Sequence, residues 1–348
     1  MTRQTRIAVV GTGAQGAGIG ADLVRAGHEV VFIEQWPAHV AAMRERGVEV
    51  RMPTRTEVTK VHAIHLCEVA ELRDAFDVVF VLVKAYDTRW AAELAKPLLA
   101  PDGVMVGLQN GMTIDDIAAV VGAHRTVGAV IEMASNMFEP GIVNRQNDPE
   151  HSWFAVGAVD PAQQHKAAAV QRLLEAAGTV ELSDDIRSSK WMKLVANAGE
   201  LVPSAILDLP LAQAAAIPEV HRFMVECGRE AVQATLADGC RLVPIMNLKD
   251  RDVSAPDQYA EDLLGIVLKE YSFPDTLTTV LQDWRKGRRG EVAEINGHVV
   301  DVLESHGRQA PCNKRTVELA LQIEAGALKA DPSNVALLVS GAPGIAER

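Results

Sequence analysis

Two hydrophobic patterns divide the chain, with strand-like runs in its first half and helical periodicity in its second. Short apolar runs rich in β-branched residues predict strands at residues 6–10, 28–33, 77–83, 104–108 and 126–132. Residues 77–83 are almost all apolar, which is typical of a central parallel strand that is buried on both faces. Helical segments between the strands complete the pattern, so the first half predicts an α/β fold.

After about residue 185 the pattern predicts helices only. They are expected at residues 190–200, 218–237, 260–271 and 278–286, with two more beginning at Glu291 and near Asn313. Ser188-Ser189 is expected to cap the first of these helices. The helix that begins at Glu291 has an apolar stripe formed by Val292, Ile295, Val299 and Val302. From about residue 330 the composition turns to Ala, Gly, Ser and Pro, which predicts a loose tail.

A glycine motif links the first predicted strand to the first helix. It reads Gly11-Thr12-Gly13-Ala14-Gln15-Gly16, and Glu34 follows 18 residues later at the end of the second strand. Gly11 allows the tight turn, Gly13 allows a pyrophosphate to approach the backbone, and Gly16 allows close packing of helix on strand. The helix N-terminus then offers N–H groups to phosphate. This context predicts a dinucleotide-binding domain with a Rossmann-type doubly wound sheet at residues 1–185, an all-α domain at 186–330 and the tail at 331–348.

Two polar residues follow later strands of the predicted sheet. Lys84 comes after the strand at 77–83, and Asn110 after the strand at 104–108. Because ligands of open parallel sheets lie outside the carboxyl ends of the strands, both residues are expected to face a bound dinucleotide. The alternatives are that Lys84 is a solvated lysine leading into a helix and that Asn110-Gly111 is a plain turn.

The first predicted helix of the second half carries a polar stripe. Lys193, Asn197 and Glu200 stand at positions i, i+4 and i+7 and therefore share one face. A lysine and an asparagine so placed can present an acid and a hydrogen-bond donor to a carbonyl group. The alternative is a solvated helix face. Glu291 lies in the first turn of a later helix, where it could equally be a surface acid that stabilises the helix dipole.

Composition excludes several classes of protein. The chain has 348 residues, of which 48% are hydrophobic and 23% charged, which is ordinary for a globular fold. The formal net charge of −12 argues against nucleic acid as a partner, and no apolar run is long enough to span a membrane. Four scattered cysteines suggest a reducing compartment, so a cytoplasmic location is expected. His62 and His65 have no further ligands at metal-site spacing, so no metal is expected.

Five blocks of sequence together resemble the ketopantoate reductases. They are the glycine motif, Val83-Lys84-Ala85-Tyr86, Leu108-Gln109-Asn110-Gly111-Met112, Lys190-Trp191-Met192-Lys193-Leu194 with Asn197, and Leu281-Gln282-Asp283 followed by Gly290-Glu291 and Ile295-Asn296-Gly297. The resemblance implies an N-terminal Rossmann domain and a helical C-terminal domain, with substrate and nicotinamide meeting in a cleft. It also implies reduction of 2-dehydropantoate to (R)-pantoate, on the route to pantothenate.

The resemblance also implies roles for individual residues. Lys193 matches the lysine that acts as general acid, and Glu291 matches the glutamate that assists it. Lys84 matches a lysine near the cofactor. The residues that match substrate-binding positions are Asn110, Asn197 and Thr279, of which Asn110 also touches the cofactor and Thr279 replaces the usual serine.

Departures from the family pattern leave the cofactor and the substrate open. The family norm is NADPH, but Glu34 would accept hydrogen bonds from a ribose hydroxyl and repel a phosphate, so NADH is expected. Leu201 and Leu211 stand where the family has asparagines, and Glu200 adds negative charge beside the first of them. A sister dehydrogenase that acts on a bulkier or less polar 2-oxo acid or ketone is therefore a second hypothesis, and a non-catalytic NAD(P)-sensing regulator is a third. A homodimer is possible.

Overall fold

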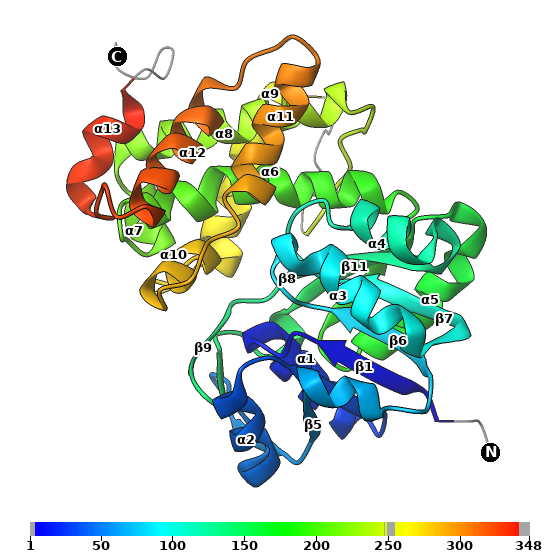
Figure 1. Ribbon diagram of the computed structural model, residues 1–348. Helices are drawn as coiled ribbons and strands as arrows, with labels where there is room; N and C mark the ends of the chain where they lie inside the picture. The colour runs from blue at the N-terminus through cyan, green and yellow to red at the C-terminus, as the bar shows by residue number, and fades with distance from the viewer. Residues whose placement is uncertain (1–3, 247, 249–254, 341–348) are drawn as a thin grey trace. The chain divides into compact units, whose positions relative to one another are not determined.

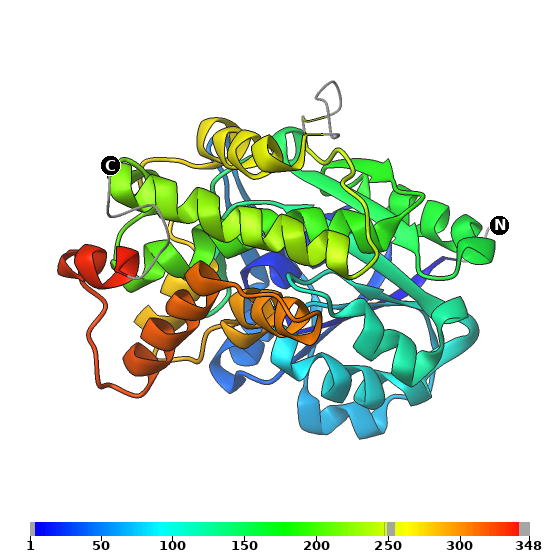
Figure 2. The same ribbon diagram turned by 90° about the horizontal axis from the view of Figure 1, so that it is seen from above.

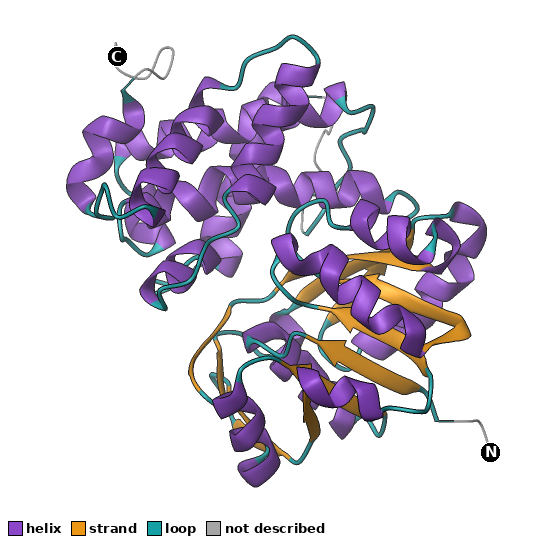
Figure 3. Cartoon of the chain, in the orientation of Figure 1, coloured by secondary structure: helices purple, strands orange, loops and turns teal. Residues whose placement is uncertain are grey.

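A computed structural model describes residues 4–246, 248 and 255–340 of the chain. The chain divides into two compact units, residues 1–187 and residues 188–348. In the described part of the chain, every strand belongs to the first unit, and the second is built from helices and loops (Figure 3). The α/β fold with an all-α second part, predicted from the sequence, is confirmed.

The first unit is built on an eight-stranded sheet. Its strands, in spatial order, are β12 (Thr179–Leu182), β11 (Trp153–Ala158), β8 (Thr126–Glu132), β7 (Leu99–Gly107), β6 (Phe76–Val81), β1 (Arg6–Val10), β2 (Glu29–Glu34) and β5 (His62–His65). All neighbours are parallel except β8 and β11. The chain runs from β1 outward to β5 and then returns past β1 to β6, so the carboxyl ends of β1 and β6 mark the switch point at which such sheets bind ligands.

Alternate residues of the central strands face opposite layers of helices. Val9 and Phe80 lie in the apolar cluster that includes α1 (Ala14–Arg25), α2 (Pro37–Arg46) and α5 (Gln164–Leu174). Val10 and Val81 lie in the cluster on the other face, with α3 (Thr88–Ala95) and α4 (Ile114–Val121) (Figure 1). Helices on both faces explain why residues of β6 are almost all apolar. The predicted doubly wound arrangement is confirmed.

A second, smaller sheet completes the first unit. Its order is β4 (Thr56–Thr59), β3 (Val48–Arg51), β10 (Ile142–Arg145) and β9 (Ser135–Glu139), and β3 pairs with β10 in parallel. The sequence does not predict this sheet, because its strands are short and their pairing joins distant parts of the chain.

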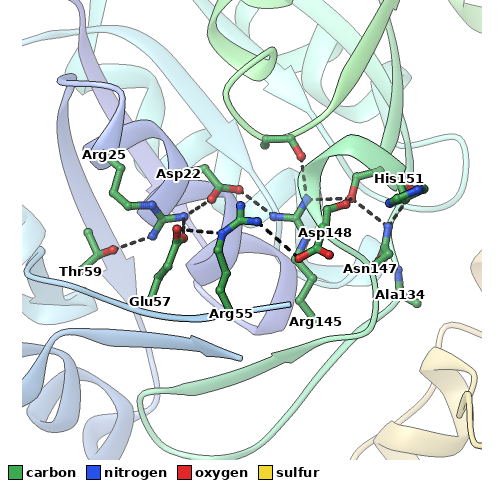
Figure 4. Close-up of polar contacts among 12 residues, drawn as sticks. Asp22, Arg25, Arg55, Glu57, Thr59, Ala134, Arg145, Asn147, Asp148 and His151 are labelled. Atoms are coloured by element: carbon green, nitrogen blue, oxygen red, sulfur yellow. Dashed lines mark hydrogen bonds and ion pairs between the residues drawn. The ribbon is translucent and has the colours of Figure 1, made fainter. Parts of the chain in front are cut away.

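A buried ionic network fastens helix α1 to the small sheet and its following loop (Figure 4). The guanidinium of Arg145, at the end of β10, donates to Asp22 of α1 at 2.8 Å, and to Ser152 and the carbonyl of Ala177 at 2.7 Å each. Asp22 also pairs with Arg25. Burial is the main influence on both partners: it raises the pKa of Asp22 and lowers that of Arg145. The network continues to the surface through Glu57, Arg55 and Asp148.

The second unit is an assembly of helices around α8. Its elements are α6 (Ile186–Ile206), which begins two residues before the unit does, α7 (Leu211–Ala215), α8 (Pro218–Ala237), α9 (Pro256–Ile266), η7 (Val267–Tyr271), α10 (Thr279–Arg285), η8 (Ala293–Gly297), α11 (His298–Ser305), α12 (Pro311–Glu324), η9 (Pro332–Asn334) and α13 (Val335–Val339). Helix α8, the long yellow-green helix of Figure 2, contacts α7, α9, α11, α12 and α13. Both η7 and η8 are π-helical turns.

Three local predictions for this unit are wrong. Helix α6 begins at Ile186, so Ser188-Ser189 lies inside it, and the Ser188 hydroxyl accepts a hydrogen bond from the backbone N–H of Arg241. The buried stripe of α11 ends on Leu303, while Val302 is half-buried, because the π turn η8 shifts the helical register. The tail predicted from residue 331 includes η9 and α13, which are anchored by the buried Leu338; residues 341–348 lie outside the described residues.

Candidate functional site

The glycine motif forms the turn between β1 and α1. Gly11 has φ +88°, and a Cβ there would lie 2.6 Å from the backbone nitrogen of Val83, so this position requires glycine. A Cβ on Gly16 would overlap the carbonyl oxygen of Gly11. At Gly13, by contrast, a Cβ would meet no described atom within 4 Å. The motif is therefore tightly packed at its two ends and open in the middle.

The first turn of α1 is suited to an anion. Gly13 is the N-cap, and no side chain of the described residues caps the helix there. The turn that follows, beginning Ala14-Gln15-Gly16, contains no acidic residue. Its backbone N–H groups and the positive end of the helix dipole fit a diphosphate that approaches over Gly13. The Gln15 side chain points elsewhere, since its amide donates to the carbonyl of Met133 at 3.3 Å.

Glu34, at the end of β2, is tied to this turn by four hydrogen bonds. One carboxylate oxygen accepts from the backbone N–H and the hydroxyl of Thr12, both at 2.8 Å. The other accepts from the backbone N–H groups of Gln35 and Trp36, at 2.9 and 3.0 Å. Both polar donors of Thr12 are thus engaged by Glu34. The carboxylate also uses the full acceptor capacity of its two oxygens within the protein.

His39 of α2 extends this arrangement. It is fully buried, accepts from the backbone N–H of Gly141 through Nδ1 at 2.9 Å, and lies 2.8 Å from the carbonyl of Thr12 through Nε2. Because Nδ1 is the acceptor, Nε2 carries the proton and donates to Thr12. Burial lowers the pKa of His39, which favours this neutral form. His39 could not be predicted as part of this turn, since a lone histidine among the alanines and charged residues of α2 carries no distinctive pattern.

The loops after β6 and β7 are joined at the same edge of the sheet. The side-chain amide of Gln109 donates to the carbonyl of Val83 at 2.7 Å and to the hydroxyl of Thr88 at 2.8 Å. Gln109 directly precedes Asn110, and Val83 directly precedes Lys84. The hydrogen bond between them therefore ties the loop after β7 to the loop after β6. Both Lys84 and Asn110 are half-buried, and Gly111 has φ +76°, so Asn110 does lie in a turn.

In the second unit, the polar stripe of α6 is buried rather than solvated. Exposure is 9% for Lys193, 1% for Asn197 and 3% for Glu200, which rules out the solvated-face alternative. The Lys193 ammonium lies 3.8 Å from a carboxylate oxygen of Glu200, so the predicted common face is confirmed for this pair. Neither the amide nitrogen nor the oxygen of Asn197 has a hydrogen-bond partner among the described residues. A buried amide in this state is suited to binding a polar ligand.

Lys190 lies on the same side of α6, one turn before Lys193. It is 3% exposed, and burial lowers the pKa of its ammonium to about 7. Strongly shifted titratable groups are common at functional sites. The sequence alone predicts no role for Lys190, which belongs to the block Lys190-Trp191-Met192-Lys193-Leu194.

A hydrogen bond joins the N-terminus of α10 to α6. The hydroxyl of Thr278, the residue before α10, donates to the carbonyl of Leu201 at 3.0 Å, so the first turn of α10, with Thr279, begins next to α6. The Thr279 hydroxyl has no partner in the part of the chain that is described. Glu291 is 4% exposed, so it is not a surface acid. The preceding Gly290 lies against Val280 of α10, where an added Cβ would come within 3.0 Å of the side chain.

The two leucines at substituted positions are both buried. Leu201 is 7% exposed and shares the α6 face of Asn197 through its i+4 spacing, while Leu211 is 3% exposed at the start of α7. The backbone N–H of Leu211 donates to the backbone carbonyl of Thr276, and this bond links α7 to the segment before α10. Apolar side chains thus flank the polar stripe at Leu201.

Comparison with known proteins identifies the family. Residues 7–160 match the model for ketopantoate reductase PanE/ApbA, and residues 185–324 match the model for the C-terminal part of the same family. The chain belongs to the ketopantoate reductase family. It is 28% identical to the 2-dehydropantoate 2-reductase of Archaeoglobus fulgidus over 327 residues, which cover 93% of this chain and 99% of that protein.

Solved structures agree with this assignment. The ketopantoate reductase of Ralstonia eutropha JMP134 has a TM-score of 0.77 and 27% identity, covering 92% of this chain and 99% of that one. D-mandelate dehydrogenase with NADH and anilino(oxo)acetate has a TM-score of 0.81 at 20% identity, over 92% of this chain and 99% of that one, and shows the shared fold.

Family membership makes this ketopantoate reductase homologue an NAD(P)-dependent oxidoreductase, which excludes the hypothesis of a non-catalytic regulator. Within the described residues, no helix is both long and apolar enough to cross a membrane. No group of three or more His, Cys, Asp or Glu side chains in the same described segments could hold a metal ion.

Proposed function

We propose that the protein reduces a 2-oxo acid to the 2-hydroxy acid, with 2-dehydropantoate and (R)-pantoate as the first candidate pair. The observation that supports this most strongly is the buried stripe of α6, where Lys193 and Glu200 lie 3.8 Å apart and the Asn197 amide is unpartnered. The Lys193 ammonium and the Asn197 amide lie on one buried face, and the amide has no hydrogen-bond partner among the described residues. This pair suits a substrate with a carbonyl oxygen and a second polar group.

A nicotinamide cofactor, when bound, supplies the hydride that adds to the carbonyl carbon. Lys193 would donate a proton from Nζ to the carbonyl oxygen as the oxygen gains negative charge. Asn197 and Thr279 would orient the substrate through their buried amide and hydroxyl. Glu291 would hold a hydroxyl of the substrate and assist Lys193.

The first unit would hold the cofactor. The diphosphate would bind to the first turn of α1 over the open side of Gly13, with Gly11 and Gly16 shaping the turn. Lys84 and Asn110 would contact the cofactor from the loops after β6 and β7, and Asn110 would touch the substrate as well. Since the donors of Thr12 and the side chain of Gln15 are engaged within the protein, any contact from these residues would use other atoms.

The cofactor that we propose is NADH. Glu34 brings a carboxylate to the end of β2, where a 2′-phosphate would meet a like charge. Because Glu34 already accepts four hydrogen bonds within the protein, we expect the preference for NADH to arise from repulsion of the NADPH phosphate and not from a hydrogen bond to the ribose. Repulsion of a phosphate needs only the charge, whereas a hydrogen bond from the ribose would compete with donors already in place.

A second candidate substrate is a bulkier or less polar 2-oxo acid. Leu201, buried on the face of Asn197, offers an apolar surface where the family pattern has an amide. A site that loses hydrogen-bonding groups discriminates less against substrates without matching hydroxyls. The structure of D-mandelate dehydrogenase was solved with an aryl-substituted oxo acid derivative, and an aryl 2-oxo acid is therefore a useful probe.

A substrate panel tests the proposal. NADH oxidation is followed at 340 nm with 2-dehydropantoate, pyruvate, 2-oxoisovalerate and phenylglyoxylate, first with NADH and then with NADPH. Highest kcat/KM for 2-dehydropantoate supports the first candidate, and highest kcat/KM for phenylglyoxylate supports the second. Lys193→Ala should lower kcat by about 10²- to 10⁴-fold while the Kd for NADH stays unchanged. Normal turnover by this variant would show that Lys193 is not the acid.

A further inference from the structure

A chain of buried amides and one carboxylate crosses the helical unit. Asn296, in the π turn η8, is fully buried, and its amide nitrogen donates to the carbonyl of Ala198 in α6 at 2.9 Å. The same nitrogen donates to Oδ1 of Asn313 at 2.8 Å. Both N–H bonds of the Asn296 amide are therefore used, one toward α6 and one toward α12.

Asn313 is in turn fixed by Glu230 of α8. The Asn313 backbone and side-chain N–H groups donate to one carboxylate oxygen at 2.9 and 2.7 Å, and the backbone N–H of Cys312 donates to the other at 2.9 Å. Glu230 thus caps the N-terminus of α12, where a negative charge is favourable. Burial nevertheless raises the pKa of this carboxyl. Through these contacts, α8 and α12 hold Asn296 in one orientation.

The carbonyl that accepts a hydrogen bond from Asn296 lies next to a gap in the backbone hydrogen bonds of α6. Pro203 has no N–H group, so the carbonyl of Gly199 lacks its usual donor four residues later in the helix. Ala198 immediately precedes this gap. Gly199 also lies against α8, where an added Cβ would come within 2.8 Å of the Met224 carbonyl. The segment of α6 that carries Asn197 and Glu200 therefore depends on neighbouring elements for its position.

We propose that Asn296 is a positioning residue that sets Asn197 and Glu200 of α6 relative to Glu291. The carbonyl of Glu291 accepts from the backbone N–H of Ile295 at 3.1 Å, so Glu291 enters the same turn that carries Asn296. The bond from Asn296 to Ala198 then couples this turn to α6 next to Asn197. The inference rests on the proposed function, because it assigns these groups to the substrate.

The expected kinetic effect is on kcat. A displacement of about 1 Å in a positioned group lowers turnover by roughly 10²-fold, so Asn296→Ala should reduce kcat by about 10- to 100-fold. The KM for the best 2-oxo acid should change less. The Kd for NADH should stay within about twofold, because the residues proposed to hold the cofactor belong to the first unit.

Asn334 provides a matched control. It is also a buried asparagine, and its amide donates to an α6 carbonyl, that of Ile206, at 3.0 Å and to the carbonyl of Lys329 at 2.8 Å. Its bond lies at the far end of α6, beyond Asn197 and Glu200. Asn334→Ala should therefore lose stability like Asn296→Ala but keep kcat. Equal losses of kcat in the two variants would overturn the proposal, because the effect would then reflect stability alone.

Asn296→Asp adds a readout that a packing defect would not move. A protonated carboxyl can donate one hydrogen bond to Ala198 or Asn313, whereas the ionised form can donate none. The kcat of this variant relative to wild type should rise several-fold as pH falls from 8 to 5.5, while the ratio for Asn296→Ala stays flat. A flat ratio for both variants would contradict the proposed role of the donated bond.

Hydrogen exchange separates this inference from the proposed reaction. In Asn296→Ala, amides near residues 197–202 should exchange faster than in wild type, while in Asn334→Ala the change should be confined to the end of α6 near residue 206. If wild type reduces no 2-oxo acid but this pattern is seen, the proposed function fails and the positioning contact remains. An unchanged exchange rate at residues 197–202 would overturn the contact itself.

Discussion

Arg145 in the first unit and Lys190 in the second are both buried cations whose pKa is lowered by burial, yet they differ in the contacts that hold their charge. Arg145, 2% exposed, uses its planar guanidinium to bond Asp22, Ser152 and the carbonyl of Ala177, so one charge joins three segments of the chain. Lys190, 3% exposed, has a pKa lowered by burial to about 7, which means that its charged form is disfavoured. Arg145 therefore joins separate segments of the fold, whereas burial works against the charged form of Lys190.

The two units also differ in where their buried charged side chains lie relative to the candidate site. In the first unit the buried ionic network supports the small sheet and the far end of α1, and the glycine turn shapes the nucleotide-binding edge. In the second unit a group of buried polar side chains lies along α6, where Lys190 accompanies Lys193 and Asn197. Buried titratable groups that lower the stability of the folded protein are typical of functional sites.

Replacing Lys190 should produce the largest change in stability. At pH 6 the lysine is largely protonated in both states, so the folded protein bears the cost of burying the charge, roughly 5 kcal/mol for a pKa shift from 10.5 to about 7. Lys190→Met should therefore raise the free energy of unfolding at pH 6, by less than this full amount because the polar contacts of the lysine are lost as well. Urea denaturation followed by circular dichroism measures the difference.

The sign of the pH dependence follows from proton uptake. Between pH 7 and about 10.5 the unfolded wild-type chain holds the Lys190 proton more tightly than the folded chain does, so wild-type stability rises with pH over this range. The advantage of Lys190→Met should shrink accordingly and vanish above about pH 10.5. Lys314→Met, at an exposed lysine paired with Glu304, should show no such gain. A Lys190→Met advantage that is constant with pH would contradict the assignment.

Replacing Arg145 should have the next largest effect, in the opposite direction. Arg145→Met leaves the buried Asp22 with Arg25 as its remaining ionic partner and removes the donors to Ser152 and Ala177, so we expect a loss of about 3 kcal/mol. The Kd for NADH should be unchanged, since the network lies away from the glycine turn. Arg55→Met, at the exposed end of the same network, should lose far less stability. Equal losses in the two variants would show that the buried bonds do not carry the stability.

The sequence predicted the first unit well because its signals are local. The strand at 126–132 matches β8, the strand at 28–33 matches β2 to within one residue, and the glycine motif lies where its context predicted. The pairing of β3 with β10 could not be predicted, because it joins short strands about 90 residues apart. Arg145 and Asp22 likewise meet only through this long-range pairing.

The candidate site of the second unit was only partly predictable. Helical spacing placed Lys193, Asn197 and Glu200 on one face, but it could not tell a buried stripe from a solvated one. The resemblance contributed Glu291 and Thr279. The contacts of Asn296 with Ala198 and Asn313 depend on how separate helices pack, and no periodicity in the sequence records them.

The smallest predicted effect concerns the cofactor and tests whether the first unit selects by charge. Gln35 is exposed and follows Glu34 directly, so Gln35→Arg adds a cation at the end of β2 without removing the four hydrogen bonds of Glu34. A nearby guanidinium offsets repulsion of a 2′-phosphate, so the NADPH-to-NADH ratio of kcat/KM should rise about tenfold, or about 1.4 kcal/mol. Gln35→Met is the control and should leave the ratio within about twofold of wild type. If Gln35→Arg also leaves the ratio unchanged, the phosphate of NADPH does not approach this end of β2, and Glu34 acts only by holding the glycine turn.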